Sequence, residues 1–432
     1  DQGGGMREQF KNAKPKLINL VHIGLFHIMG SNVINYFILF LTNIFIVRLL
    51  NKTNYGIYSY AYNLYSIVLL FSGLGLLNGL LQYGSEARPE PEKLAYQRFG
   101  LLFGLLFDLF LSAVIFLYGN YAKAAIPQAS NYIKLFALLP LFDYLYNFCL
   151  IVLRANKKNK EYARLLNANT VYNFLCTCAG AYFFGISGVI LGKYLSFTLS
   201  ALTGFSICKK NARKMITAGR LQPSQKREFI RYSFICCLSA CVVSLLYYVD
   251  ILVVGHFISD AAVVASYKTA TLIPTALTFI PNSVMILLYP YFAERNHDYP
   301  WIKQHLRELI RCLFCFNAAI TVLLILCAPL IIRILWGEEY LDAIAPFRIL
   351  MISYFVTATF RIPCINILAA LRKVKLNLIV GIISAVSNIV LDILFIQIWG
   401  VNGVSAATVL VFVIASGIYY PYLKYYLHDK AP

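Results

Sequence analysis

Apolar residues gather in twelve stretches of the chain, each about 20 residues long or longer. They cover roughly residues 17–47, 56–80, 99–118, 131–153, 163–184, 187–207, 230–254, 263–292, 309–332, 343–370, 377–398 and 403–423. A helix needs about 20 mainly apolar residues to cross the hydrocarbon core of a membrane. The pattern therefore predicts an all-α polytopic membrane protein with twelve transmembrane helices. Pro274, Pro281 and Pro290 in the eighth stretch and Pro363 in the tenth are expected kink sites.

Basic residues are distributed unevenly between the connecting segments. Twenty-nine of the 38 Lys and Arg residues lie in segments on the side of the N-terminus, and four lie in segments on the other side. Because cytoplasmic segments carry an excess of Lys and Arg, we expect both termini in the cytoplasm. This placement also accounts for the net charge of +19, so we expect no nucleic-acid partner.

The composition excludes several classes of protein. Hydrophobic residues make up 59% of the chain and charged residues 13%, whereas soluble domains are about half apolar and a quarter charged. A soluble domain and a disordered chain are therefore excluded. Most of the 11 cysteines lie in apolar stretches, and Cys312 and Cys315 form a C-x-x-C without a partner pair. We expect no metal site and no bound cofactor.

The two halves of the chain carry a repeat. At an offset of 215 residues, eleven of 55 positions in 135–189 are identical to those in 350–404, and both segments contain the spacing Asn-x11-Gly-x2-Gly. Six stretches separate the copies, so both keep one orientation, which predicts two six-helix lobes related by a pseudo-two-fold axis. We expect five segments along the chain. Residues 1–16 combine a start that looks foreign to the natural protein with a basic cytoplasmic N-terminus, and they are followed by an N-lobe (17–207), a basic cytoplasmic linker (208–229), a C-lobe (230–427) and a cytoplasmic tail (428–432).

Three motifs resemble those of one transporter family. Residues 48–59 (RLLNKTNYGIYS) resemble its R-L-L-x4-[FY]-G-x-Y, and residues 337–340 (GEEY) resemble its G-E-x-Y. Residues 388–392 (NIVLD) and 399–407 (WGVNGVSAA) resemble its N-x-x-L-D … G-x-x-G-A-A, with Ser405 where the family often has Gly or Ala. The family is the Wzx-type polysaccharide flippases, for O-antigen or capsule repeat units, of the multidrug/oligosaccharidyl-lipid/polysaccharide superfamily.

The resemblance implies a MATE-like fold and a transporter rather than an enzyme. Its substrate would be an oligosaccharide on undecaprenyl pyrophosphate, flipped from the inner to the outer leaflet of the bacterial cytoplasmic (inner) membrane. Alternating access and coupling to a proton or sodium gradient are expected, with membrane lipids and other polysaccharide-assembly proteins as partners. Two alternatives stay open: an ion-coupled multidrug antiporter of the same fold, and a polytopic polysaccharide polymerase or ligase.

Charged residues inside spans are costly and usually face a cavity. The basic candidates for contacting the pyrophosphate are Arg361, Lys268, Lys193, Arg48, Arg348 and Lys134. For Lys134 and Arg348, near helix ends, interface anchoring is the alternative, and for Arg48 a structural role. The acidic candidates for ion coupling or charge pairing are Asp143, Asp250, Asp392 and Asp108.

Four tyrosines recur at helical spacing in the second stretch: Tyr55, Tyr58, Tyr62 and Tyr65. Sugar rings stack on aromatic faces, so this row is a candidate glycan contact. The alternative is an aromatic belt at the membrane interface.

Overall fold

The part of the chain that the structure describes is built from helices and contains no strand. This computed structural model describes residues 25–86 and 88–429, so the expected N-terminal segment 1–16 and residues 430–432 of the tail lie outside it. The elements are α2 (Leu25–Leu49), α3 (Lys52–Leu69), η1 (Ser72–Gly75), α4 (Leu76–Ser85), α5 (Glu90–Tyr121), α6 (Ala129–Leu135), α7 (Leu139–Ala155), α8 (Asn159–Ile207), α9 (Lys209–Ile216), α10 (Pro223–Ile258), α11 (Ala261–Leu277), α12 (Phe279–Glu294), α13 (Tyr299–Leu326), α14 (Ala328–Leu335), η2 (Glu338–Ala343), α15 (Ile344–Val356), η3 (Thr357–Arg361), α16 (Ile362–Ala370) and α17 (Val374–Asp429).

The lengths of these helices confirm an all-α, multi-pass membrane fold. Among the described residues, six helices are long and apolar enough to cross a membrane, or up to nine if each bent pair forms one span. The count of twelve stays a prediction.

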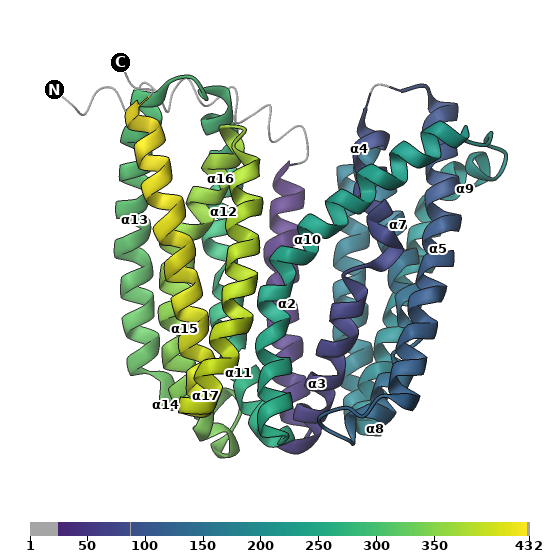
Figure 1. The fold of residues 1–432 in the computed structure, drawn as a ribbon. Helices are drawn as coiled ribbons and strands as arrows, with labels where there is room; N and C mark the ends of the chain where they lie inside the picture. The colour runs from purple at the N-terminus through teal and green to yellow at the C-terminus, as the bar shows by residue number, and fades with distance from the viewer. Residues whose placement is uncertain (1–24, 87, 430–432) are drawn as a thin grey trace.

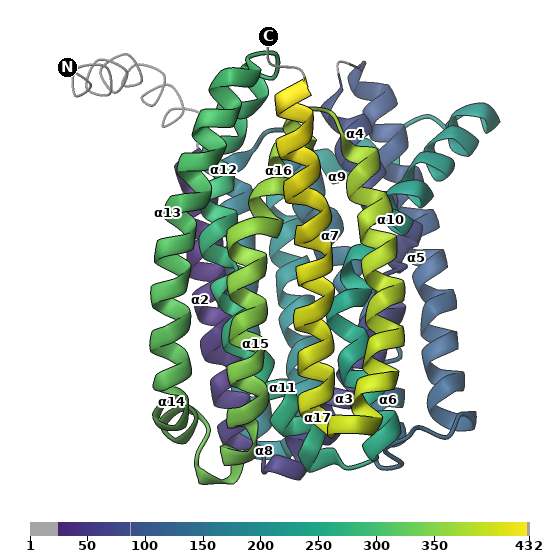
Figure 2. The ribbon, with the colours of Figure 1, turned by 60° about the vertical axis from the view of Figure 1, so that its left-hand side comes forward.

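The longest helices, α8 and α17, each contain a sharp turn at a glycine. Gly185 has φ 58° and ψ −137°, and Gly400 has φ 57° and ψ −136°. Residues that carry a Cβ atom rarely adopt this backbone conformation. The two arms of α17 then lie close together, because a Cβ on Gly403 would be 2.0 Å from the carbonyl oxygen of Phe395. Figure 2 shows α17 folded back on itself in this way.

A second pair of turns has the same 215-residue offset. Lys157 and Arg372 both have positive φ, at 57° and 58°. The following N–H groups, of Lys158 and Lys373, donate to the carbonyls of Leu153 and Leu368 at 3.0 and 2.8 Å. Such a bond closes the end of a helix whose next residue is left-handed. These turns repeat the same backbone geometry in the two halves of the chain.

The helices form two bundles, with α10 running obliquely between them (Figure 1). We call α2–α9 the N-terminal bundle and α11–α17 the C-terminal bundle. The first half of α10 packs on the N-terminal bundle, where the Phe229 ring lies 5.3 Å from that of Tyr83 and 5.1 Å from that of Tyr96. The segment expected to be a linker, 208–229, thus contains α9 and the start of α10, and buries Met215 and Leu221.

Several helices are interrupted. α3 and α4 are bent by 41° at η1, and α6 and α7 by 46°. η1 contains two left-handed glycines, Gly73 and Gly75. In the eighth stretch the break between α11 and α12 falls at Thr278, three residues before Pro281, and in the tenth the π-helical η3 ends two residues before Pro363. Proline removes a backbone donor from the helix, which accounts for breaks at these places.

Candidate functional site: a polar cavity between the bundles

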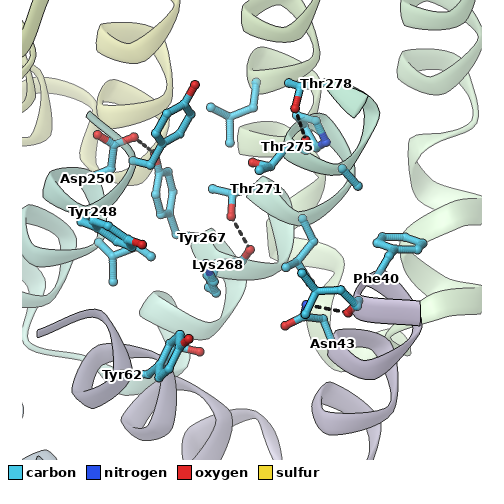
Figure 3. Close-up of a pocket in the computed structure, with 18 of the residues that line it drawn as sticks. Phe40, Asn43, Tyr62, Tyr248, Asp250, Tyr267, Lys268, Thr271, Thr275 and Thr278 are labelled. Carbon is cyan, nitrogen blue, oxygen red and sulfur yellow. Dashed lines mark hydrogen bonds between the residues drawn. The ribbon is translucent and has the colours of Figure 1, made fainter. Parts of the chain in front are cut away.

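Both bundles line a cavity of about 520 Å³. The N-terminal bundle contributes residues of α2, α3 and α8, the C-terminal bundle contributes residues of α11, α15 and α17, and α10 contributes from between them. Figure 3 shows its wall, in which side chains of α2 and α3 face those of α10 and α11. The cavity therefore lies where movement of the bundles would change its access.

Two lysines, Lys193 of α8 and Lys268 of α11, line this cavity. Lys193 follows the turn at Gly185 by eight residues, and Lys268 follows the start of α11 by seven. At 1.5 Å per residue, both lie about 10–12 Å from the same end of the molecule. Within the described residues neither forms an ion pair with a carboxylate. The cavity thus offers one cation from each bundle at similar depth.

The tyrosine row predicted as a glycan contact is continuous. Ring centroids are 6.4 Å apart for Tyr55 and Tyr58, and 5.8 Å apart both for Tyr58 and Tyr62 and for Tyr62 and Tyr65. The first three tyrosines line the cavity, whereas Tyr65 stacks on Phe136 at 5.0 Å. The ammonium of Lys193 lies 4.6 Å from the ring centre of Tyr62. A cation and an aromatic face are therefore adjacent on the cavity wall.

Two of the acidic candidates, Asp250 of α10 and Asp392 of α17, meet where α10 packs on the C-terminal bundle. The amide of Asn388 donates to Asp250 at 3.2 Å and to Asp392 at 2.9 Å. Asp250 also accepts from the hydroxyls of Tyr267 at 2.7 Å and Thr408 at 2.9 Å. Asp392 is fully buried, and one of its oxygens has no hydrogen-bond partner in the described structure. We call these five residues the carboxylate cluster; Asp250, Tyr267 and Thr408 connect it to the cavity.

Arg361 lies beside the cavity rather than among the residues that line it. It is 6% exposed, donates to the hydroxyl of Tyr247 at 3.4 Å, and lies 4.9 Å from the ring centre of Phe412. Tyr247 and Phe412 both line the cavity. In this structure Arg361 therefore supports the wall from behind, and its contact with a substrate stays a prediction.

Arg48, Arg348 and Lys134 lie outside the cavity. Arg48 donates to the last carbonyls of α14, at Ile334 and, at 2.7 Å, at Leu335. Arg348 donates to the carbonyl of Ile325 near the end of α13 at 3.1 Å. Both guanidinium groups thus satisfy carbonyls that a helix end leaves free. The side chain of Lys134 packs near Gly119.

The other two acids have different surroundings. Asp108 is fully buried and accepts from the Ser72 hydroxyl at 2.9 Å and the Gly73 N–H at 2.7 Å, so it holds the break between α3 and α4. Asp143 of α7 interacts electrostatically with Lys193. The environment of Asp108 favours a structural role, while Asp143 lies near the cavity cation.

One end of the cavity is closed by direct contact between the bundles. Lys52 binds Asp342 at 2.8 Å, and the Ser266 hydroxyl donates to the same carboxylate at 2.8 Å. At Gly56 the helices α3 and α11 approach so closely that a Cβ would lie 1.7 Å from the carbonyl oxygen of Ala261. We call this region the closed end; the four basic residues expected outside the cell lie at helix ends and in a loop on this side of the molecule.

Several lining residues were not predicted from the sequence: Tyr36, Asn43, Asn173, Tyr247, Tyr248, Tyr267 and Thr408. The repeat held a signal for two of them. Asn173 pairs with Asn388 at the 215-residue offset, and Lys193 pairs with Thr408. Comparing the halves for polar residues would have selected these positions.

The model of a family described as "Polysaccharide biosynthesis protein" matches residues 45–345, which is more than half of the chain. The protein belongs to this polysaccharide biosynthesis family. The match covers both bundles in part, and together with the fold it confirms the resemblance to Wzx-type flippases.

Several solved transporters share the fold of this protein. An inward-facing multidrug resistance MATE family transporter of the MOP superfamily matches with TM-score 0.77 and 14% identity, over 92% of this chain and 95% of that one. The lipid II flippase MurJ in an inward closed conformation matches with TM-score 0.73 and 16% identity, over 92% and 86%. A MOP superfamily transporter from Pyrococcus furiosus has TM-score 0.60 and 14% identity, over 94% and 96%. No curated protein sequence matches the chain significantly.

Proposed function

We propose that this protein flips oligosaccharide repeat units on undecaprenyl pyrophosphate from the inner to the outer leaflet of the bacterial cytoplasmic membrane, without covalent chemistry. The observation that carries the proposal is the pair of cavity lysines, Lys193 and Lys268, presented by opposite bundles. A diphosphate loses hydration when it leaves the interface, and charge-assisted hydrogen bonds of about 1.5–3 kcal/mol each offset part of that cost.

The rest of the substrate has a place in the same scheme. Tyr62, the partly exposed member of the tyrosine row, offers a ring against which a sugar can pack, and the buried Tyr55 and Tyr58 support it. The prenyl tail is apolar, so it can stay in the lipid between the bundles while only the head group enters the cavity. Opening the closed end and closing the opposite one would move the head group across the membrane.

Ion coupling is part of the proposal, with the carboxylate cluster as the site. Carboxylate and hydroxyl oxygens are ligands that a hard cation such as Na⁺ prefers, and a buried carboxylate pair can also retain a proton. The coupling ion would be cargo and would enter from the cavity side, at Asp250.

Complementation of a bacterial strain that lacks its own repeat-unit flippase tests the function. The wild-type protein should restore surface polysaccharide, and the double variant Lys193→Ala, Lys268→Ala should not. Lys123→Ala, which removes an exposed lysine outside the cavity, is the matched control. Export by the double variant equal to wild type, at equal membrane abundance, would refute the role of the two lysines.

Orientation has its own test. With the accessible native cysteines replaced, Lys123→Cys should react with an impermeant thiol reagent from outside the cell, and Lys210→Cys only after the membrane is opened. Outside labelling at position 210 would overturn the proposed cytoplasmic termini.

A further inference from the structure

Three consecutive residues of α11 contact three different regions: the closed end, the carboxylate cluster and the cavity. Ser266 donates to Asp342, which also binds Lys52 at the closed end. Tyr267 donates to Asp250 in the carboxylate cluster, and Lys268 lines the cavity. Successive side chains of a helix point about 100° apart, so one rigid turn carries all three contacts. Figure 3 shows Tyr267 directed toward Asp250 and Lys268 on the cavity wall.

Asp250 accepts three hydrogen bonds in this arrangement, and two of them fall on the same oxygen, Oδ2. One oxygen accepts from Asn388, and the other accepts from both Tyr267 and Thr408. A cation needs oxygen lone pairs, and both of those on Oδ2 of Asp250 are already directed at hydroxyl hydrogens. A cation that binds through Oδ2, the oxygen shared by Tyr267 and Thr408, therefore has to displace one of these two donors.

Tyr267 is the donor whose displacement has the farthest consequence. Its side chain is fully buried, and a buried hydroxyl that loses its acceptor is unfavourable. Thr408 has an alternative acceptor, because the carbonyl oxygen of Val404 also lies within hydrogen-bond distance of its hydroxyl, at 3.1 Å. Release of Tyr267 from Asp250 can be relieved by a shift of α11, and such a shift pulls Ser266 away from Asp342.

We propose that Tyr267 is a positioning residue that competes with Na⁺ for Asp250 and thereby couples cation binding to opening of the closed end. The biological role of this coupling rests on the proposed transport function, whereas the experiments that test the coupling do not require transport. Without Na⁺, the bond from Tyr267 holds α11 in the position that closes this end. With Na⁺ bound, the bond is lost and the closed end loosens.

The first test measures Na⁺ binding through the thermal unfolding of the purified full chain in detergent, with choline as the replacement cation. Tyr267→Phe removes the competing donor, so half of the Na⁺-dependent stabilisation should appear at a several-fold lower Na⁺ concentration than in wild type. Tyr144→Phe removes another buried hydroxyl, which donates to the Gly100 carbonyl at 2.6 Å away from the cavity, and should titrate like wild type. Asp250→Asn should abolish the response.

The second test measures the coupling itself. Nitroxide labels on Lys123→Cys and Glu339→Cys, in a chain whose native cysteines are replaced, report the distance between the two bundles at the closed end. Both side chains are exposed. Na⁺ should lengthen this distance in the otherwise wild-type chain. In Tyr267→Phe the distance should be the same in Na⁺ and in choline.

Three results would overturn the proposal. A higher Na⁺ requirement in Tyr267→Phe would make Tyr267 a ligand rather than a competitor. A Na⁺-dependent distance change that survives in Tyr267→Phe would remove Tyr267 from the coupling. If the otherwise wild-type chain responded to Na⁺ neither in stability nor in distance, Na⁺ would have no role in the proposal. This result can be obtained even if the Tyr267→Phe variant does not fold. Failure of export in the complementation assay, by contrast, refutes only the proposed function.

Discussion

The two bundles have kept the same turns but carry opposite chemistry at equivalent polar positions. Gly185 and Gly400 share their φ and ψ within one degree. Around them the N-terminal bundle has Lys193 where the C-terminal bundle has Thr408, and Thr177 where it has Asp392. At a third pair of equivalent positions both bundles have asparagine, Asn173 and Asn388. The comparison teaches that the backbone is shared while the charge is not.

In the proposed ion-coupled transport, this difference would give the two bundles different roles. The N-terminal bundle presents a fixed ammonium group beside the Tyr62 ring, which suits an anionic head group. The C-terminal bundle and α10 together present two carboxylates, Asp392 and Asp250, which suit an exchangeable cation. Lys193 occupies the repeat position of Thr408, a residue of the carboxylate cluster. The N-terminal bundle thus has a covalently attached cation at the position where we propose that a free cation binds in the other half.

The largest effect is expected from reversing the charge of the N-terminal bundle. Lys193→Glu replaces an attraction for the diphosphate by a repulsion. We expect undecaprenyl diphosphate to bind on the order of 100-fold more weakly, since each charged hydrogen bond is worth about 1.5–3 kcal/mol and 1.4 kcal/mol is tenfold. Ligand-dependent thermal stabilisation measures this, with undecaprenol as the neutral ligand. Unchanged affinity, with Lys123→Glu also unchanged, would refute the anion site.

The next effect comes from making the C-terminal bundle resemble the other. Thr408→Lys places an ammonium group beside Asp250, where it should occupy the cation's place. We expect the affinity for Na⁺, measured from the Na⁺ dependence of thermal unfolding, to fall at least about tenfold, because one charged hydrogen bond of about 1.5 kcal/mol already has that effect. Thr198→Lys, a partly buried threonine of α8 outside the cavity, is the comparison variant. A Thr408→Lys protein that still responds to Na⁺ like wild type would contradict the assignment.

A smaller and symmetrical effect is expected at the turns. Gly185→Ala and Gly400→Ala each force a Cβ into a conformation reserved for glycine, although no atom lies within 4 Å of the new methyl group. Each should destabilise the protein by about 1–3 kcal/mol. Gly417→Ala, also in open space but with ordinary helical φ, is the control. Thermal unfolding that differs strongly between the two turn variants would break the equivalence of the bundles.

The smallest effect is expected for the basic residue that only closes a helix end. Arg348→Ala removes an exposed side chain that donates to one carbonyl of α13. The loss should be about 0.3–1 kcal/mol of stability, with surface polysaccharide within about twofold of wild type. A strong export defect at normal abundance would return Arg348 to the list of substrate contacts.

Much of this fold was predictable because membrane spans and glycine turns are local. Apolar runs, basic segments and the Asn-x11-Gly-x2-Gly spacing are visible in the chain itself. The break at η1 was not predictable, since it depends on Asp108, which lies more than 30 residues away in sequence. The path of α10 was not predictable either, because its first half packs on the N-terminal bundle through the contact of Phe229 with the distant Tyr83.

The candidate site was predicted in part for the same reason. A lysine inside a span is conspicuous, so Lys193 and Lys268 were identified from the sequence. Arg48 was equally conspicuous, but its guanidinium group binds the end of α14. This contact joins residues 286 positions apart, so no local sequence pattern indicates it. Tyr267 and Thr408 are ordinary residues for a membrane helix, and only their distance to Asp250 gives them a role.

The most direct measurement is transbilayer movement in proteoliposomes. Undecaprenyl diphosphate bearing a labelled disaccharide is placed in both leaflets, and an external glycosidase removes the sugar that reaches the outer one. With wild-type protein the whole label should become cleavable. With the Lys193→Ala, Lys268→Ala protein only the fraction initially outside should be lost. Complete cleavage by the double variant at the wild-type rate, or no movement by the wild type, would contradict the account.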